Sequence, residues 1–426
     1  MIDPAALRRR APPIDRSRDR LVALGAIVVA VAFLIAALLS LAMPAPSRLG
    51  LWLPLHLALA GGASTAIAGV LPFFVAAFAA APPSDARLRT AAVAAIASGA
   101  VAVAIGFVGA TPGLTVAGGS AFVGGVLLTA AAGVRPLGRA LGPSRGLVTR
   151  AYVVALGEVA LGATIATLFA AGWPPLVDGW FRMKPAHAWL NLAGFVSLVI
   201  ATTLLHFFPT VVGARIAVRP SARVTVGGLA LGPPVVAAGI VLDTDLVARL
   251  GAAAVVAGAA ALAVYAWRTW AGRGHWTTDP GWHRFAMGGL ISAIAWLEAG
   301  VAIAAGRVFA FGADPASWST DTVAGPLVAG WMALAVLASA THLLPAVGPG
   351  DPAAHARQRQ LLGSAAGARL ALANVGVAGI AVGLPTSSGL LVQAGAVALA
   401  IAVGGTAALL IAAVRIGLSG RPRGGS

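Results

Sequence analysis

The chain of 426 residues contains no cysteine. This absence excludes disulfide bonds, thiolate-ligated zinc, iron–sulfur clusters held by cysteine, cupredoxin-type copper and cysteine-attached haem. Any metal ion or haem must therefore be held by histidine, methionine or carboxylate side chains.

Charged residues are also scarce, since they make up 10% of the chain against 59% hydrophobic residues. A soluble domain has roughly a quarter charged residues. Apolar runs of about 20 residues recur along the whole chain, as in polytopic helical membrane proteins. We therefore expect an all-α membrane protein, with the lipid bilayer as its surrounding partner.

The formal net charge of +16 comes from arginines in short segments between the apolar runs. We find no basic groove with interleaved aromatic residues, so nucleic acid is not an expected partner. The chain has 28 arginines, one lysine, and abundant alanine and glycine, a composition typical of GC-rich bacterial genomes. We expect the bacterial plasma membrane as the location.

The apolar runs predict twelve transmembrane helices within one membrane domain, residues 21–416. The first run is too long for the core of a signal peptide, so we interpret it as a spanning helix that follows a basic tail, residues 1–20. A second tail covers residues 417–426. The predicted helices are 21–43, 51–80, 88–110, 113–134, 149–172, 186–212, 223–242, 245–267, 283–306, 322–346, 367–384 and 388–415.

The arginine-rich segments all fall on one side of the membrane when twelve helices are drawn. Positive charge marks the cytoplasmic side, so both termini are expected in the cytoplasm. Arg182 and Lys184 are the exception, in the opposite loop 173–185. That loop is also rich in tryptophan, which predicts an interfacial belt.

A repeat of four helices is indicated by the second, sixth and tenth helices. Aligning Gly194 with Gly330 also pairs His206 with His342, at an offset of 136 residues. Aligning Gly61 with Gly194 pairs the segments LALAG and LNLAG. We expect a pseudo-threefold arrangement of units covering about 21–134, 149–267 and 283–415.

Four intramembrane histidines are candidate cofactor ligands. His187 and His206 lie 19 residues apart on one helix, or about 28 Å, too far to share a metal ion. We therefore expect His56 to pair with His187 near the outer face, and His206 with His342 near the cytoplasmic face. Asn191, four residues after His187, shares its helix face and could assist it as a metal ligand or orienting group.

Simpler interpretations stay open for these residues. A histidine near a helix end can extend toward the lipid headgroups, and a His-x-x-Pro sequence can mark a helix exit. Three further histidines, in or beside cytoplasmic loops, are expected to be solvated: His275, His283 and His355.

Two acids lie within predicted helices, Glu158 and Glu298. Ionisable groups inside a bilayer are costly, so a proton path, a cation site or a histidine partner would account for them. A satisfied polar contact between helices is the alternative. No phosphate-binding, dinucleotide-binding or hydrolase motif stands in a suitable context.

Twelve helices, cytoplasmic termini, a threefold repeat of four helices and histidines on the second, sixth and tenth helices resemble subunit I of the haem–copper oxidases. The segment HAWLNLAGF (187–195) is similar to segments of small relatives of that superfamily. The segment THLLPAVG (341–348) resembles membrane regions of actinobacterial proteins, some of which are joined to copper-oxidase domains. The twelve-helix plan is also similar to that of haem- and copper-containing membrane proteins linked to nitric-oxide stress.

The resemblance implies that His56 is an axial haem ligand and that His187 is a copper ligand. The seventh helix, Val224–Leu242, lacks the histidine pair of that family, and Thr322–Ala324 lacks its axial histidines. A complete oxygen or nitric-oxide reductase is therefore not expected.

Three functions remain open from the sequence. The first is a haem or copper binder in redox chemistry or metal handling, with a copper or haem protein as redox partner. The second is a secondary transporter, with a path formed by Glu158, Glu298 and the helix interruption at Pro233 and Pro234. The third is a non-catalytic structural or assembly subunit in the membrane, whose histidines are incidental.

Overall fold

The computed structural model describes residues 17–79, 81–139, 146–217, 219–274 and 282–419, and across these ranges it contains helices and no strands. Twelve helices in this part are long and apolar enough to cross a membrane. The predicted class, an all-α polytopic membrane protein, is therefore confirmed. His275 and most of both predicted tails lie outside the described residues.

Nine of the twelve spans are each built around one α-helix: α2 (Ser17–Ser40), α5 (Ala86–Val108), α6 (Pro112–Val134), α7 (Leu147–Ala170), α11 (Pro220–Val241), α12 (Asp245–Ala271), α13 (Trp282–Phe311), α17 (Ala366–Gly383) and α18 (Gly389–Ser419). Proline begins α6 and α11, where its missing N–H costs no hydrogen bond. Several of the predicted boundaries move outward by a few residues; for example, α2 begins four residues inside the predicted tail, and α13 continues to Phe311.

The other three spans, the second, sixth and tenth, are composite. The second joins α3 (Trp52–His56), η1 (Leu57–Ala63) and α4 (Ser64–Phe78). The sixth joins α9 (Trp180–Ala188), η3 (Trp189–Val196) and α10 (Ser197–Val212). The tenth joins η5 (Pro315–Ser317), α14 (Thr320–Val323), η6 (Ala324–Met332) and α15 (Ala333–Val347). These three spans are the most buried of the twelve, and η1 contacts both η3 and η6, so they form the centre of the bundle.

The segments η1, η3 and η6 are π-helical, whereas the short segments η2 (Arg135–Arg139) and η5 are 3₁₀ turns. The π-helical segments end at Ala63, Val196 and Met332, which are separated by the same 133 and 136 residues as the aligned glycines. A π-helical turn is rare and is frequent at functional sites. Its recurrence in one register three times supports the four-helix repeat.

Glycine contacts in the helical hairpins follow the same repeat. In the hairpin of α5 and α6, a Cβ atom added at Gly99 would meet backbone atoms of Gly118 and Phe122. In the hairpin of α11 and α12, a Cβ atom added at Gly232 would meet Gly251 and Val255. Gly376 has the same relation to Gly395 and Leu399 in α17 and α18. The glycines therefore allow close backbone contact between the last two helices of every unit.

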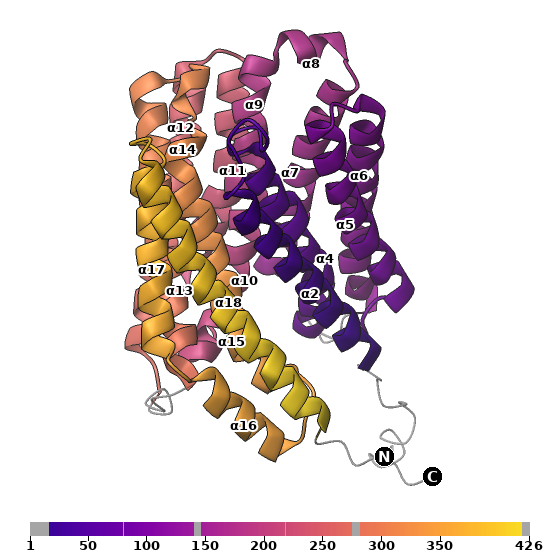
Figure 1. Cartoon of the computed structure of the whole chain (residues 1–426), viewed down its shortest axis with the longest axis vertical. Coiled ribbons are helices and arrows are strands. Elements are labelled where there is room, and N and C mark those ends of the chain that lie inside the picture. The colour runs from indigo at the N-terminus through magenta and orange to yellow at the C-terminus, as the bar shows by residue number, and fades with distance from the viewer. Residues whose placement is uncertain (1–16, 80, 140–145, 218, 275–281, 420–426) are drawn as a thin grey trace, which may run out of the picture.

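The third unit carries an insertion that the sequence did not predict. Gly232 and Gly376 lie 144 residues apart, whereas Gly194 and Gly330 lie 136 apart. The additional residues fall in the connection that contains α16 (Pro352–Leu362), a short polar helix whose first turn is capped by the Asp351 carboxylate. This helix lies across the lower end of the bundle in Figure 1.

The predicted loop 173–185 is helical, which corrects the sequence interpretation. It contains α8 (Pro174–Asp178) and the beginning of α9, because Pro174 stands at a favourable first helical position. Arg182 forms an ion pair of 2.7 Å with Asp243 and donates to the Ile240 carbonyl. Its unexpected positive charge is therefore neutralised. We name the two ends of the bundle the α8 end and the α16 end (Figure 1).

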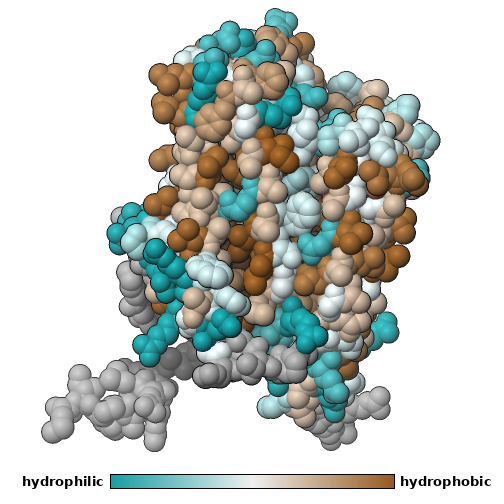
Figure 2. Space-filling model, turned by 90° about the vertical axis from the view of Figure 1, so that its left-hand side faces the viewer, coloured by the Kyte–Doolittle hydropathy of each residue, from teal (hydrophilic) through white to brown (hydrophobic). Residues whose placement is uncertain are grey.

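The outer surface is apolar between these ends. In Figure 2 hydrophobic residues cover much of the middle of the visible face, and hydrophilic residues gather toward the top and bottom. Large aliphatic side chains such as Leu231 and Leu390 are 64% and 77% exposed. Such exposure would be unfavourable in water but is expected against lipid chains.

Candidate functional site

His56 and His187 lie together at the α8 end of the bundle. Their ring centroids are 6.5 Å apart, and the ring planes are within 14° of parallel. His56 ends α3 directly before η1, and His187 is the second-last residue of α9, which η3 follows directly, so both histidines lie at the start of a π-helical segment. The two residues that the sequence paired across units 1 and 2 are neighbours in space.

Both imidazoles are oriented by backbone carbonyl groups. Nδ1 of His56 lies 2.7 Å from the Trp52 oxygen, and Nδ1 of His187 lies 2.8 Å from the Gly162 oxygen. A carbonyl can only accept, so Nδ1 carries the proton in each neutral ring and Nε2 keeps its lone pair. This is the arrangement by which proteins prepare a histidine to bind a metal ion.

Asn191 contacts His187 from the next turn of the same span. Its Nδ2 donates to the His187 carbonyl at 2.7 Å and lies 3.2 Å from His187 Nδ1. A Cβ atom added at Gly162 would overlap the Asn191 amide, so α7 approaches this turn closely. Asn191 thus holds the backbone turn that carries His187, and no contact assigns it as a metal ligand.

Aromatic rings enclose the histidine pair on both sides. Trp52 stacks on His56 with a centroid distance of 4.1 Å, and Phe107 stacks on Trp52 at 4.2 Å. On the other side Trp180 lies 6.4 Å from His187 and stacks on Phe169. Both histidines remain partly accessible. The rings fix the two histidines in place and lower the local polarity.

The other two candidate histidines do not contact each other in the ring contacts of the described residues. His206 lies beside Phe78, with centroids 4.7 Å apart. His342 lies beside Phe207, stacks on Trp282 and has its ring centroid 5.7 Å from that of His283. The expected pairing of His206 with His342 is therefore replaced by a pairing of His342 with His283.

His283 corrects a second expectation. It is only 2% exposed, although the sequence placed it at a solvated loop. It belongs to the first turn of α13, which packs against α15, and this packing buries the ring. A search for histidines beside predicted helix starts would have included it. His355 is half-buried on α16.

The two intramembrane acids have different surroundings. Glu158 on α7 is 6% exposed, and neither carboxylate oxygen has a hydrogen-bond partner among the described residues. Glu298 on α13 is half-buried and has one buried oxygen without a partner. Neither acid forms an ion pair or hydrogen bond with a histidine in this part of the chain, so the predicted histidine partner is not observed.

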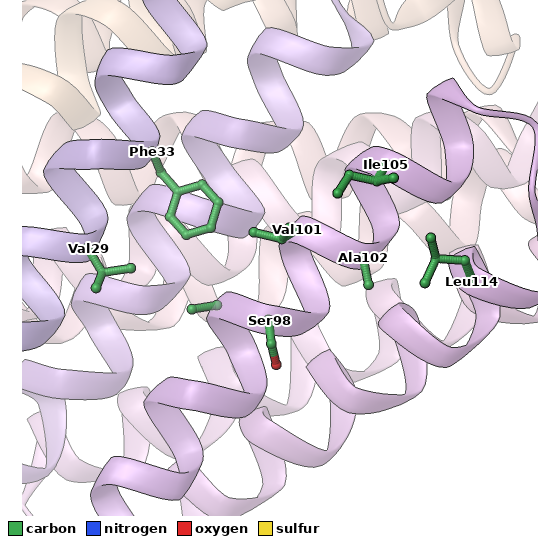
Figure 3. A pocket seen from close by; sticks show the side chains of 8 residues that line it. Val29, Phe33, Ser98, Val101, Ala102, Ile105 and Leu114 are labelled. Carbon is green, nitrogen blue, oxygen red and sulfur yellow. The ribbon is translucent and has the colours of Figure 1, made fainter.

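Two apolar hollows open elsewhere. A groove of about 500 Å³ lies between α2, α5 and α6. Figure 3 shows the side chains that line it, among them Phe33, Val101 and Ile105. A smaller pocket of about 100 Å³ lies between the first and third units and is lined almost wholly by aliphatic side chains, including Leu38, Leu55 and Leu399. Neither includes a candidate histidine, and both suit lipid chains.

Among the predicted site residues that the structure describes, only His56 and His187 combine close proximity with imidazoles oriented by carbonyl groups. Within these residues no group of three or more histidine, cysteine or acidic side chains is placed to hold a metal ion. Two neutral imidazoles suit copper or haem iron, which accept two protein nitrogens. No protein-family model matches this chain, and no curated protein matches it.

Proposed function

We propose that this integral membrane protein binds one copper ion or one haem iron between His56 and His187, and that it serves redox chemistry or metal handling. The observation that carries the proposal is the parallel arrangement of the two rings, 6.5 Å apart, with both Nδ1 atoms bonded to carbonyl groups. These hydrogen bonds leave Nε2 of both rings free, and His56 and His187 would hold the metal through these two atoms.

The donor set fits either metal centre. Neutral imidazole is a favoured ligand of copper and an axial ligand of haem iron, and the chain offers no thiolate that would compete. The bound metal would supply one-electron transfer. His56 and His187 would hold it, Asn191 would keep His187 in position, and the stacked tryptophans would exclude water from the site.

A complete oxygen or nitric-oxide reductase is not part of this proposal. The seventh span, α11, contains no histidine that could add ligands beside His187. The tenth span begins with η5 and α14, which also lack histidine. The proposed role is therefore electron transfer, or delivery of the metal to a partner protein, rather than reduction of a gas.

The metal content and absorption spectrum of the purified protein test this proposal. Copper in a ratio of one per chain supports the copper form, and an intense haem band supports the haem form. The metal or band should be lost in His56→Ala and in His187→Ala. His355→Ala, on the peripheral helix α16, is the matched control and should keep the wild-type content. A protein that binds neither copper nor haem contradicts the proposal.

A further inference from the structure

The repeat assigns a special position to Glu158. In each unit the first helix presses one side chain against a glycine of the π-helical segment. Phe33 faces Gly61, Trp296 faces Gly330, and Glu158 faces Gly194. Two units thus place an aromatic ring at this position, where the second unit places a carboxyl group.

The carboxyl group has no compensating partner. Glu158 is 94% buried, because its exposed fraction is 6%, and both oxygens lack hydrogen bonds within the described residues. An isolated carboxylate in such surroundings costs many kcal/mol, so the neutral, protonated form is the one this site favours. An aromatic ring fills the same position in the other two units, so packing at this position does not require a carboxyl group.

The interrupted helix α11 packs close to the Glu158 carboxyl group. A Cβ atom added at Gly194, which would overlap the Glu158 carboxylate, would also lie 3.5 Å from Cβ of Pro233. Pro233 and Pro234 lie inside α11 and have no N–H, so the carbonyls of Leu229 and Ala230 lose their helical donors. The interruption of α11 therefore places backbone carbonyls that lack a helical donor in the helix that packs beside Glu158.

A polar route leads from Glu158 toward the α8 end. Gly162 lies one turn further along α7, where it faces Asn191, and Asn191 in turn contacts His187. Glu158 and Asn191 therefore follow one another along the contact of α7 with η3, and His187 in α9 comes next toward the α8 end. An amide can donate and accept simultaneously, which suits it to relay hydrogen bonds.

We propose that Glu158 carries a proton in the interior of the membrane and exchanges it with the α8 end of the protein past Asn191. The ligand of this site is the proton itself. The site requires no metal, so it goes beyond the function proposed above and can fail or hold independently of it.

The charged and titratable groups around α7 leave Glu158 without a counter-ion. Besides Glu158, α7 and the helices packed against it contain these charged or titratable residues: Arg150, Tyr152, Asp178, Arg182, Lys184, His187, His206 and Arg223. The Tyr152 hydroxyl forms a hydrogen bond with Thr203, and Arg182 forms an ion pair with Asp243. No ion pair or hydrogen bond joins any of these groups to Glu158 in the part of the chain that the structure describes. A proton is the charge that neutralises the carboxylate.

Infrared spectroscopy of the metal-free protein in lipid vesicles tests the first part of the proposal. A protonated carboxyl group has a separate C=O stretching band, which should be present near neutral pH in wild type and in Glu158→Asp. Glu158→Gln should remove it, and Glu298→Gln should leave the Glu158 component in place. Identical wild-type and Glu158→Gln spectra would overturn the proposal, as would a band that appears only when sodium ions are withheld.

Exchange in heavy water tests the route. Deuteration shifts the carboxyl band, so the exchange rate of the Glu158 proton can be followed directly. Asn191→Leu should slow this exchange about tenfold, corresponding to a barrier higher by ~1.4 kcal/mol. Asn191→Ser keeps a polar group and should exchange faster than Asn191→Leu. Asn374→Leu, which removes an amide from α17, is the control. Equal exchange rates in Asn191→Leu and wild type would exclude the proposed route.

Discussion

At the scale of single residues, helix length predicts the depth of a histidine in the membrane but not its direction. The 19-residue separation of His187 and His206 assigns them to opposite ends, and the structure brings His56 and His187 together at one end. The same reasoning paired His206 with His342, yet His342 lies beside His283. Depth is a property of the sequence, whereas the angle around each helix axis depends on packing between helices.

The role of Glu158 illustrates the same limit. Its presence inside a helix marks it from the sequence as a costly group. The structure adds that Glu158 occupies the position of an aromatic residue in the other two units. This follows from the contacts of Phe33 with Gly61 and of Trp296 with Gly330. The offsets between these first helices differ from those between the central spans, so sequence alignment of the central spans alone does not match them.

Asn191 gives a prediction at this scale. We expect Asn191→Ala to weaken metal binding at His56 and His187 by about 10–100-fold, because the variant loses the amide that holds the turn carrying His187. The apparent dissociation constant can be measured by competition with a chelator for copper, or by titration with haem.

Asn374→Ala is the matched control for this measurement. Asn374 also donates its amide to a carbonyl four residues earlier in its helix, at 2.9 Å, but it lies in the third unit. Its substitution should leave the metal affinity unchanged. Equal weakening in both variants would show a general loss of stability instead of a positioning role for Asn191.

At the scale of helices, the pattern of apolar runs predicts every span, because a bilayer demands about 20 apolar residues. The π-helical segments could not be predicted in this way. Within these segments Gly61, Gly194 and Gly330 each pack against a side chain of the first helix of their unit, and this packing is not visible in the apolar pattern. In the glycine-rich hairpin of α5 and α6 the backbones of Gly99 and Gly118 lie in close contact.

The hairpin of α5 and α6 supplies a prediction with an internal control. Gly125 faces the backbone of Ala92 and Ile96, whereas nothing lies within 4 Å of a Cβ atom added at Gly124. We expect Gly125→Val to lower the free energy of unfolding by about 1–3 kcal/mol, since the added side chain forces the helices apart.

Thermal unfolding in one detergent compares these variants. Gly124→Val should melt close to wild type, while Gly125→Val should melt at a clearly lower temperature. If the two variants melted together, close packing of this hairpin would not contribute to stability.

At the scale of the whole molecule, the distribution of arginine predicts the orientation in the membrane. The described residues of the α16 end include Arg357, Arg359 and Arg369, and positive charge is retained on the cytoplasmic side. Arg182 at the α8 end is paired with Asp243, which reduces its weight in this balance. We therefore expect the histidine pair to face the outside of the cell.

The absence of cysteine allows a direct test of this orientation. Single cysteines can be introduced at Asp178 on α8 and at Ala353 on α16, which are both exposed. A membrane-impermeant maleimide should label Asp178→Cys in intact cells and Ala353→Cys only after permeabilisation. The reverse pattern would place the histidine pair on the cytoplasmic side.

The central claim is that His56 and His187 hold one and the same metal centre. Metal stoichiometry should be measured in wild type, His56→Ala, His187→Ala and the double variant, with the absorption spectrum of each recorded beside it. One shared centre predicts one metal per wild-type chain and the same complete loss in all three variants. A metal content that is unchanged, or that falls in two separate steps from single to double variant, would contradict the account.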